Sequence, residues 1–220
     1  MSDRVIRAAG LAAVLFVVLI LISAFVAGAP PSADASADKI RAFLVDHRSA
    51  LLISNFLGLL AVPLVVWFVV VLREVVLGDR LANALGTAAV AGILITAPMA
   101  MAGGAISVSP LYADGVAGKL GDDTVRIVFE AQNLLFASTS AGIVLFAVAA
   151  ALAIRRSGAL PAYTMWVGLL AAALNVVAMF STLSAGASGV GFLGLIGFAL
   201  FLLVAGGTMV AGKARPALQP

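Results

Sequence analysis

The chain has 220 residues, of which 63% are hydrophobic and only 10% are charged, whereas soluble domains carry about 25% charged residues, so an ordinary soluble fold is excluded. The formal net charge is +3, but the cations lie in short segments between apolar stretches, which excludes a nucleic-acid-binding protein. With no cysteine and a single histidine, His47, disulfides, thiolate sites and paired-imidazole sites are excluded too.

Long apolar stretches without charged residues dominate the sequence. A hydrocarbon core about 30 Å thick is crossed by about 20 apolar residues in a helix. Stretches of about that length cover residues 8–29, 50–72, 81–106, 134–154, 163–183 and 190–212. We therefore predict an all-α integral membrane protein, with one transmembrane domain (1–220) built as a bundle of about six helices.

The first apolar stretch also fits a second interpretation. Arg4 and Arg7 precede it, and the small residues 27–29 resemble the site at which a signal peptide is cut. The stretch is longer than the 7 to 15 residues typical of a signal peptide, and the prolines at 30–31 would hinder cleavage. We expect an uncleaved membrane anchor.

The distribution of charge between the connections orients the predicted bundle. One face has eight cations against three acidic residues, and the other has five cations against seven acidic residues. The face rich in Lys and Arg is cytoplasmic by the positive-inside rule, which places both termini inside. Trp67, Tyr163 and Trp166 fall near cytoplasmic helix ends, where aromatic rings favour the headgroup level.

Two longer connections, at about 30–49 and 107–133, lie on the external face of this topology. In the first, Ser36 or Asp38 can cap an amphipathic helix over 39–48. In the second, acidic residues at 122–123 can cap a short amphipathic turn over 124–130, in which Arg126 and Glu130 are spaced to form an i, i+4 pair. We expect both segments to be short external interfacial helices.

Uncharged polar residues gather in the outer halves of the predicted helices. They can line a cavity that opens externally, or hydrogen-bond between helices and back to their own helix. The residues predicted for such a polar cavity are Asn55, Gln132, Asn133, Ser138 and Asn175. Asn55 and Asn175 are the most informative, because an amide within a helix needs partners for both donor and acceptor.

Glycines spaced three apart mark a possible packing face on the last helix. Gly191, Gly194 and Gly197 would allow another helix to approach closely, either within the chain or in a protein partner or second copy. Their spacing does not distinguish these alternatives.

Sequence signatures of catalysis and cofactor binding are missing from the chain. It has no G-x-S-x-G or H-E-x-x-H motif, no phosphate-binding glycine-rich loop, and no charged residue near the centre of an apolar stretch. We predict a protein that is not an enzyme and has no catalytic, cofactor-binding or metal-binding residues.

Three short motifs stand out at the start of the chain, in the first long connection and before the fifth apolar stretch: RAAGL at 7–11, DKIRAFL at 38–44 and RRSGALPAY at 155–163. Together they resemble motifs of a broad family of six-helix bacterial membrane proteins with a domain of unknown function. The resemblance implies a multi-pass protein of the bacterial inner (plasma) membrane and transfers no site residues to this chain.

Two functions are consistent with these features. The first is a non-enzymatic membrane protein or accessory subunit, whose partners are lipids and another protein. The alternative is a carrier or binding protein for a small apolar or lipid-like solute, indicated by the polar residues and by Pro63 and Pro98, which interrupt two of the predicted helices.

Overall fold

The computed structural model describes residues 1–183 and 189–215, and in these ranges it is helical with no strand. Six helices are long and apolar enough to cross a membrane, which confirms the predicted all-α architecture. The long helices are α1 (Asp3–Ala27), α3 (Arg48–Val75), α4 (Arg80–Val108), α5 (Asp122–Ser157), α6 (Ala162–Met179) and α7 (Gly191–Val210). The shorter ones are α2 (Ala37–Asp46), η1 (Ser109–Leu111), η2 (Ala117–Lys119) and η3 (Phe180–Thr182).

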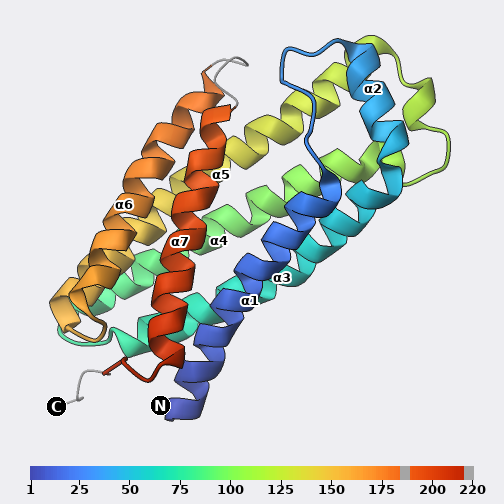
Figure 1. The fold of residues 1–220 in the computed structure, drawn as a ribbon. Coiled ribbons are helices and arrows are strands. Elements are labelled where there is room, and N and C mark those ends of the chain that lie inside the picture. Colours follow the sequence, from blue (N-terminus) through green and yellow to red (C-terminus); the bar gives the residue numbers. More distant parts are fainter. Residues whose placement is uncertain (184–188, 216–220) are drawn as a thin grey trace.

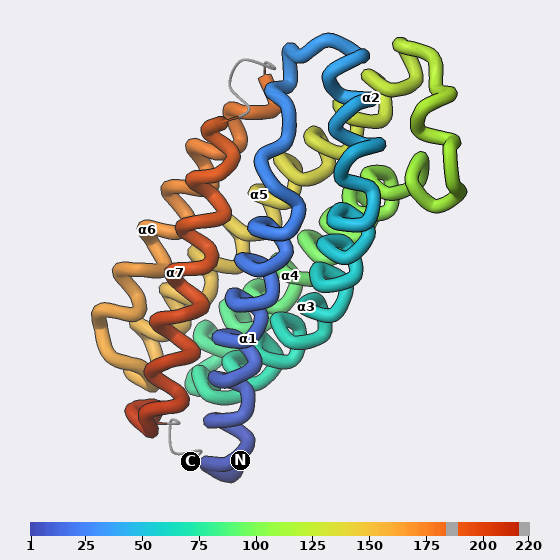
Figure 2. The backbone as a smooth tube through the Cα atoms, turned by 45° about the vertical axis from the view of Figure 1, so that its right-hand side comes forward, coloured from blue at the N-terminus to red at the C-terminus, as the bar shows by residue number. Residues whose placement is uncertain are grey.

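The long helices form a closed ring. In chain order, α1 packs on α3, α3 on α4, α4 on α5, α5 on α6 and α6 on α7, and α7 returns to α1 (Figure 1). Figure 2 shows α1 between α7 and α3, with both chain ends at the same end of the bundle. We call this end the terminal end, and the opposite end, which carries α2, the α2 end. The first apolar stretch is thus an integral helix of the bundle.

One predicted boundary differs from the structure. The stretch at 134–154 is the second part of α5, which begins at Asp122 and includes the turn predicted separately at 124–130. No proline interrupts this segment, so the helix continues through its charged residues, and it ends where Gly158 adopts a left-handed conformation with φ 64°. Helix α5 is about 54 Å long and therefore extends beyond a bilayer core of about 30 Å.

Glycine pairs bring two helix pairs into close contact. A Cβ atom at Gly10 of α1 would lie 2.5 Å from the carbonyl oxygen of Gly206 in α7. A Cβ atom at Gly92 of α4 would lie 2.6 Å from the carbonyl oxygen of Gly142 in α5. Such small residues allow membrane helices to approach until their backbones touch, so these positions set the spacing of the ring.

Aromatic side chains fill the centre of the ring. Phe146 of α5 lies edge-on to Phe198 and Phe201 of α7, with ring centroids 5.8 and 5.4 Å apart. Phe198 also meets Phe16 of α1, at 5.8 Å. Edge-to-face pairs of this kind stabilise a core beyond the area that they bury. The bundle is therefore closed at this level.

A second, smaller core lies at the α2 end. It joins α2 to η1, η2 and the first turns of α5 through the buried side chains of Ile40, Leu44, Leu111, Ala117, Val125 and Phe129. Arg41 binds Asp38, Asp122 and the carbonyl oxygen of Leu120, so it links α2 to the start of α5. This packing explains why α5 continues on the N-terminal side of its apolar stretch.

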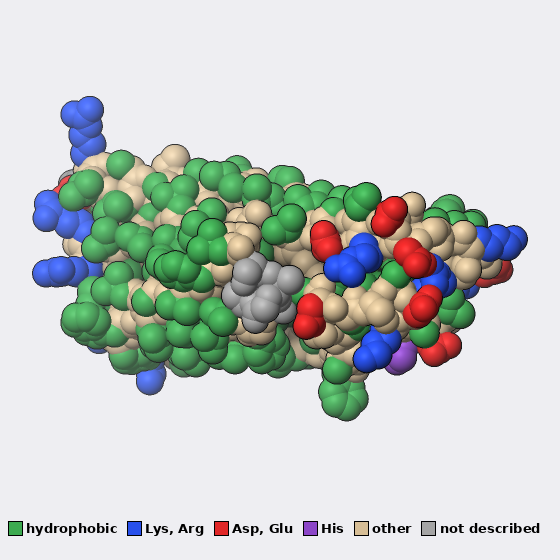
Figure 3. Space-filling view, turned by 90° about the horizontal axis from the view of Figure 1, so that it is seen from above, with side chains coloured by type: hydrophobic (Ala, Val, Ile, Leu, Met, Phe, Trp, Pro, Cys, Tyr) green, Lys and Arg blue, Asp and Glu red, His purple; other side chains and the backbone are tan. Residues whose placement is uncertain are grey.

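Charged side chains gather at the two ends of the molecule and leave a largely apolar band between them (Figure 3). At the terminal end, Arg156 of α5 forms an ion pair with Asp79, 2.5 Å away, in the turn between α3 and α4. At the α2 end, Arg48 donates to the carbonyl oxygen of Leu111 at 2.8 Å and pairs with Asp114. The charged ends are thus cross-linked between segments that are distant in sequence.

Candidate functional site

A pocket lies toward the α2 end, where α5, α6 and α7 surround it and the connection after α1 reaches its edge. Its volume is about 510 Å³. From Glu130 to Ser140 it follows α5 over about 15 Å. Its lining is mostly apolar, with polar groups between, and consists of Ala33, Glu130, Asn133, Leu134, Phe136, Ala137, Thr139, Ser140, Ile143, Asn175, Ser181, Thr182, Gly191 and Leu195.

The aromatic core lies one helical turn beyond the end of this pocket that is lined by Ile143 and Leu195. Ile143 and Leu195 line the pocket, and the next helical turn of each chain segment carries Phe146 and Phe198, which contact each other. Phe146 is fully buried and Phe198 nearly so. The pocket is therefore separated from the terminal end of the bundle.

Asn175 of α6 is the most deeply buried polar group of the pocket, with 0% of its surface exposed. Its Nδ2 donates to the carbonyl oxygens of Ala171 at 2.9 Å and Gly194 at 3.0 Å. These two acceptors determine the orientation of the amide, because the flipped amide would place Oδ1 against two carbonyl oxygens. The hydrogen bond to Gly194 is possible because a glycine at this position, which has no side chain, lets α7 approach α6 closely.

The other end of that amide has no partner. Asn175 Oδ1 is buried and accepts no hydrogen bond from the residues that the structure describes. A buried acceptor without a donor costs about 1–3 kcal/mol, and such groups call for a specific explanation. Asn175 also lines the pocket, but Oδ1 faces the Cα of Gly194 and is closed off from the pocket space, so a donor on a bound molecule reaches this oxygen only when α7 shifts slightly away from α6.

Three hydroxyl groups of the lining donate to their own helices. Thr139 Oγ1 donates to the carbonyl oxygen of Phe136 at 2.5 Å, Ser181 Oγ to that of Ala178 at 2.6 Å, and Thr182 Oγ1 to that of Met179 at 2.7 Å. Their hydrogens are occupied, so the free capacity that they offer the pocket is as acceptors.

Glu130 lies at the edge of the pocket nearest the α2 end. It forms the ion pair expected from the i, i+4 spacing, with Glu130 Oε1 3.6 Å from Arg126 Nη2, and 54% of its side chain is exposed. Among the described lining residues there is no Lys or Arg. The pocket therefore presents acceptor groups, one carboxylate, and the donor groups of the Asn133 amide and the Ser140 hydroxyl, which suits a neutral or cationic molecule that forms hydrogen bonds.

Two of the five predicted cavity residues, Asn133 and Asn175, line this pocket. The other three lie outside its described lining. Gln132 is next to Asn133 but is rotated about 100° around α5. Ser138 donates back to the carbonyl oxygen of Leu134 at 2.7 Å. Asn55 of α3 lies against Gly104 of α4, on a different pair of helices.

Sequence reasoning missed the importance of Glu130 and of the apolar lining residues. Glu130, Asn133, Ala137 and Ser140 are spaced by three or four residues, so they share one face of α5. The periodicity of these residues could therefore have been used to predict which face of α5 lines the pocket. The residues contributed by α7 and by the connection after α1 carried no such signal, because their proximity arises from tertiary packing.

The glycine face of α7 packs against α6 within the same chain. A Cβ atom at Gly194 would lie 2.8 Å from both Ala178 Cβ and Asn175 Oδ1, and one at Gly197 would lie 3.1 Å from Leu174 Cβ. At Gly191 the nearest atom is Ser181 Oγ, 3.4 Å away. Of the two alternatives for these glycines, the structure shows the contact within the chain.

Titratable side chains do not form a metal site in the described part of the chain, where no group of three His, Cys, Asp or Glu residues comes together. His47 lies between α2 and α3 and stacks on Phe43, with ring centroids 4.5 Å apart. Its Nδ1 is 3.2 Å from the carbonyl oxygen of Phe43. His47 therefore has a local structural role at this junction.

Comparison with known proteins gives no identification. No family model, curated protein or solved structure matches the chain. The family resemblance of the three short motifs stays a prediction, and the pocket is the best guide to function.

Proposed function

We propose that this protein is a multi-pass protein of the bacterial inner membrane that binds a small, mostly apolar or lipid-like solute from the external side and serves as its carrier. The support for a membrane location is the set of six helices long and apolar enough to cross a bilayer. The support for a solute is the pocket of about 510 Å³ between α5, α6 and α7, a volume within the usual range for small-molecule sites.

The proposed orientation places the terminal end in the cytoplasm and the α2 end outside, together with α2 as an interfacial helix. It follows from the excess of Lys and Arg at the terminal end. The chain has no cysteine, so single cysteines can be added to test it. A membrane-impermeant maleimide added to intact cells should label Ser36→Cys and leave Ser157→Cys unlabelled, and the reverse pattern would refute the orientation.

The observation that carries the binding proposal is the unpartnered Oδ1 of Asn175 in a pocket that is otherwise mainly apolar. A solute with one hydrogen-bond donor and an apolar body would pair this oxygen after a small shift of α7 away from Asn175, and would cover Leu134, Phe136, Ile143 and Leu195. Buried polar partners discriminate strongly, because a ligand without the donor leaves the oxygen unsatisfied. Asn175 is therefore expected to set affinity and specificity together.

The experiment compares Asn175→Leu with Gln132→Leu. The first change removes the acceptor from the pocket, and the second removes an amide outside the described lining. We expect mass spectrometry of gently purified protein to find a small molecule that is retained by the wild type and by Gln132→Leu and lost from Asn175→Leu. Equal retention by all three proteins, or no bound molecule in any, would contradict the proposal.

An accessory subunit remains the second candidate, but a specific observation weakens it. It rested on the absence of buried charge and of chemical motifs together with the glycine face of α7, and α6 of the same chain packs against that face. Consistent isolation of this protein in a stoichiometric complex with another membrane protein, without a solute, would favour the subunit over the solute-binding protein.

A further inference from the structure

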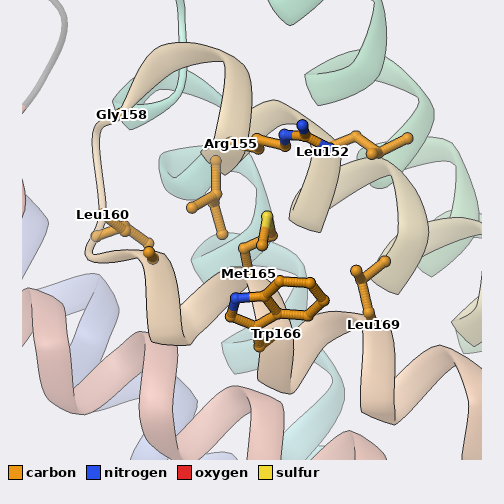
Figure 4. A pocket seen from close by; sticks show the side chains of 9 residues that line it. Leu152, Arg155, Gly158, Leu160, Met165, Trp166 and Leu169 are labelled. Atoms are coloured by element: carbon orange, nitrogen blue, oxygen red, sulfur yellow. The ribbon is translucent and has the colours of Figure 1, made fainter.

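A second cavity lies at the terminal end, on the outer surface of the bundle between α5 and α6. Its volume is about 470 Å³. Figure 4 shows Leu152 and Arg155 from the last turns of α5 on one side and Met165, Trp166 and Leu169 from α6 on the other. The cavity is separate from the solute pocket, because the two share no lining residue.

Arg155 is the charged residue of this cavity, and it differs from its neighbour Arg156. Arg156 is paired with Asp79, at 2.5 Å. No ion pair to Arg155 is formed by the acidic side chains that the structure describes, and no acidic residue lines the cavity. An Arg guanidinium presents several donors in a planar fork that suits phosphate, so Arg155 is available to bind an anionic group.

The remainder of the cavity is apolar and has one amphipathic ring. Leu160 and Met165 are buried at its base, while Trp166 is 64% exposed. Trp166 lies about 6 Å along α6 from the first residue of that helix, Ala162, which also lines the cavity. Exposed tryptophans at helix ends favour the headgroup level of a bilayer, and an indole N–H can donate a hydrogen bond there.

We propose that this cavity is a binding site for an anionic phospholipid of the leaflet at the terminal end. The phosphate lies between the guanidinium of Arg155 and the start of α6, where the helix dipole favours a negative group. An acyl chain follows the apolar wall formed by Leu152, Met165 and Leu169. Anionic lipid is favoured over zwitterionic lipid because the cavity supplies a cation and no acidic side chain to pair with a choline or ethanolamine group.

The test is native mass spectrometry of the full-length protein in detergent, titrated with phosphatidylglycerol or phosphatidylcholine of the same chain length. The variants are Arg155→Gln and, as a control, Arg4→Gln, which removes the same charge from the same end without altering the cavity lining. Trp166→Phe keeps the ring and removes its N–H donor. Circular dichroism and the thermal unfolding midpoint check that each variant is folded.

We expect the wild type and Arg4→Gln to bind phosphatidylglycerol in preference to phosphatidylcholine. Arg155→Gln should weaken phosphatidylglycerol binding roughly fivefold and leave phosphatidylcholine unchanged, because one cation near an anionic lipid contributes about that factor. Trp166→Phe should give a smaller loss. An equal loss in Arg4→Gln would show a general charge effect, and equal binding of free glycerol phosphate would show a phosphate site without lipid; either result overturns the proposal.

Discussion

Asn175 and Gly194 hold α6 and α7 together at the edge of the solute pocket, with the Nδ2 of Asn175 3.0 Å from the carbonyl oxygen of Gly194. The contact needs a glycine, because any Cβ at position 194 would overlap the amide. The same close approach leaves Oδ1 of Asn175 without a partner among the described residues. The packing of α6 on α7 and the position of the proposed binding atom, Asn175 Oδ1, therefore both depend on this pair of residues.

Gly194→Ala should destabilise the protein. The added methyl group would lie 2.8 Å from Ala178 Cβ and Asn175 Oδ1, so α7 must move away from α6. Overpacking of this kind typically costs about 1–3 kcal/mol. The measurement is the free energy of unfolding in mixed detergent micelles.

Gly207→Ala on the same helix is the matched control. A Cβ atom at Gly207 has no atom within 4 Å, so this change should leave stability unchanged or raise it slightly. Equal destabilisation by the two substitutions would mean that α7 does not pack on α6 through its glycine face.

Thr164→Val should stabilise the protein by about 1 kcal/mol. Thr164 is fully buried near the start of α6, and its Oγ1 has no hydrogen-bond partner in the described part of the chain. Valine has the same shape without the unsatisfied hydroxyl. Unfolding free energies of the two proteins, measured under identical detergent conditions, give the comparison.

Thr208→Val should instead lower the free energy of unfolding. Thr208 Oγ1 donates to the carbonyl oxygen of Val204 at 2.7 Å and lies 3.2 Å from Tyr163 Oη, so the change removes satisfied contacts. A loss of stability in both variants would indicate that the Thr164 hydroxyl is bonded after all.

Arg41→Lys should loosen α2. The guanidinium of Arg41 reaches Asp38, Asp122 and the carbonyl oxygen of Leu120 together, whereas an ammonium group cannot match this planar fork. Amide hydrogen exchange in Ala37–Asp46 should become faster, with the core helices unchanged. Lys39→Arg, a change of the same chemical size on α2, should leave exchange unaltered, and equal acceleration in both would argue against the cross-link.

The ion pair between Asp79 and Arg156 should make the thermal stability of the protein depend on pH. The hydrogen bond from Arg156 lowers the pKa of Asp79 from its ordinary value, helped by the backbone N–H of Ala82. A carboxyl group with a lower pKa in the folded state stabilises the protein above its unfolded pKa of about 4, and this contribution is lost as the pH falls through the folded pKa. Thermal unfolding midpoints measured from pH 7 to pH 3 follow this loss.

Asp79→Asn is expected to lower the midpoint at pH 7, because asparagine can still cap α4 but cannot form the ion pair. The difference from wild type should shrink toward zero as the pH falls below about 4. Asp3→Asn, at the same end, removes no ion pair of the described residues and should show no such convergence. A difference that stayed constant with pH would exclude the ion pair as its cause.

The helices were predictable from sequence because their signal is local. Crossing a bilayer needs about 20 apolar residues without charge, and all six predicted stretches correspond to long helices in the structure. The start of α5 was not predictable by the same criterion, since a search for apolar runs stops at the charged residues around Glu130. Packing of Val125 and Phe129 against α2 extends that helix beyond the apolar stretch.

The pocket was only partly predictable. Asn133 and Asn175 could be selected because an amide in an apolar helix is unusual, but the same argument selected Asn55, which lies on another pair of helices. Polarity in an apolar helix identifies which residues could line a pocket. Which side of the bundle each of these residues points to depends on how its helix packs against the neighbouring helices. The cavity beside Arg155 gave no sequence signal apart from a cation and a tryptophan near helix ends.

The sequence by itself determined that this is a helical chain with six membrane-length apolar segments and an uneven distribution of charge between its ends, because hydropathy and charge are properties of each segment alone. Only the tertiary structure decided which faces meet. The glycines of α7 pack on α6, the aromatic rings close the centre of the ring, and the amide of Asn175 is left with one end unpaired. These features depend on close contacts between helices, and no single segment contains the information that specifies them.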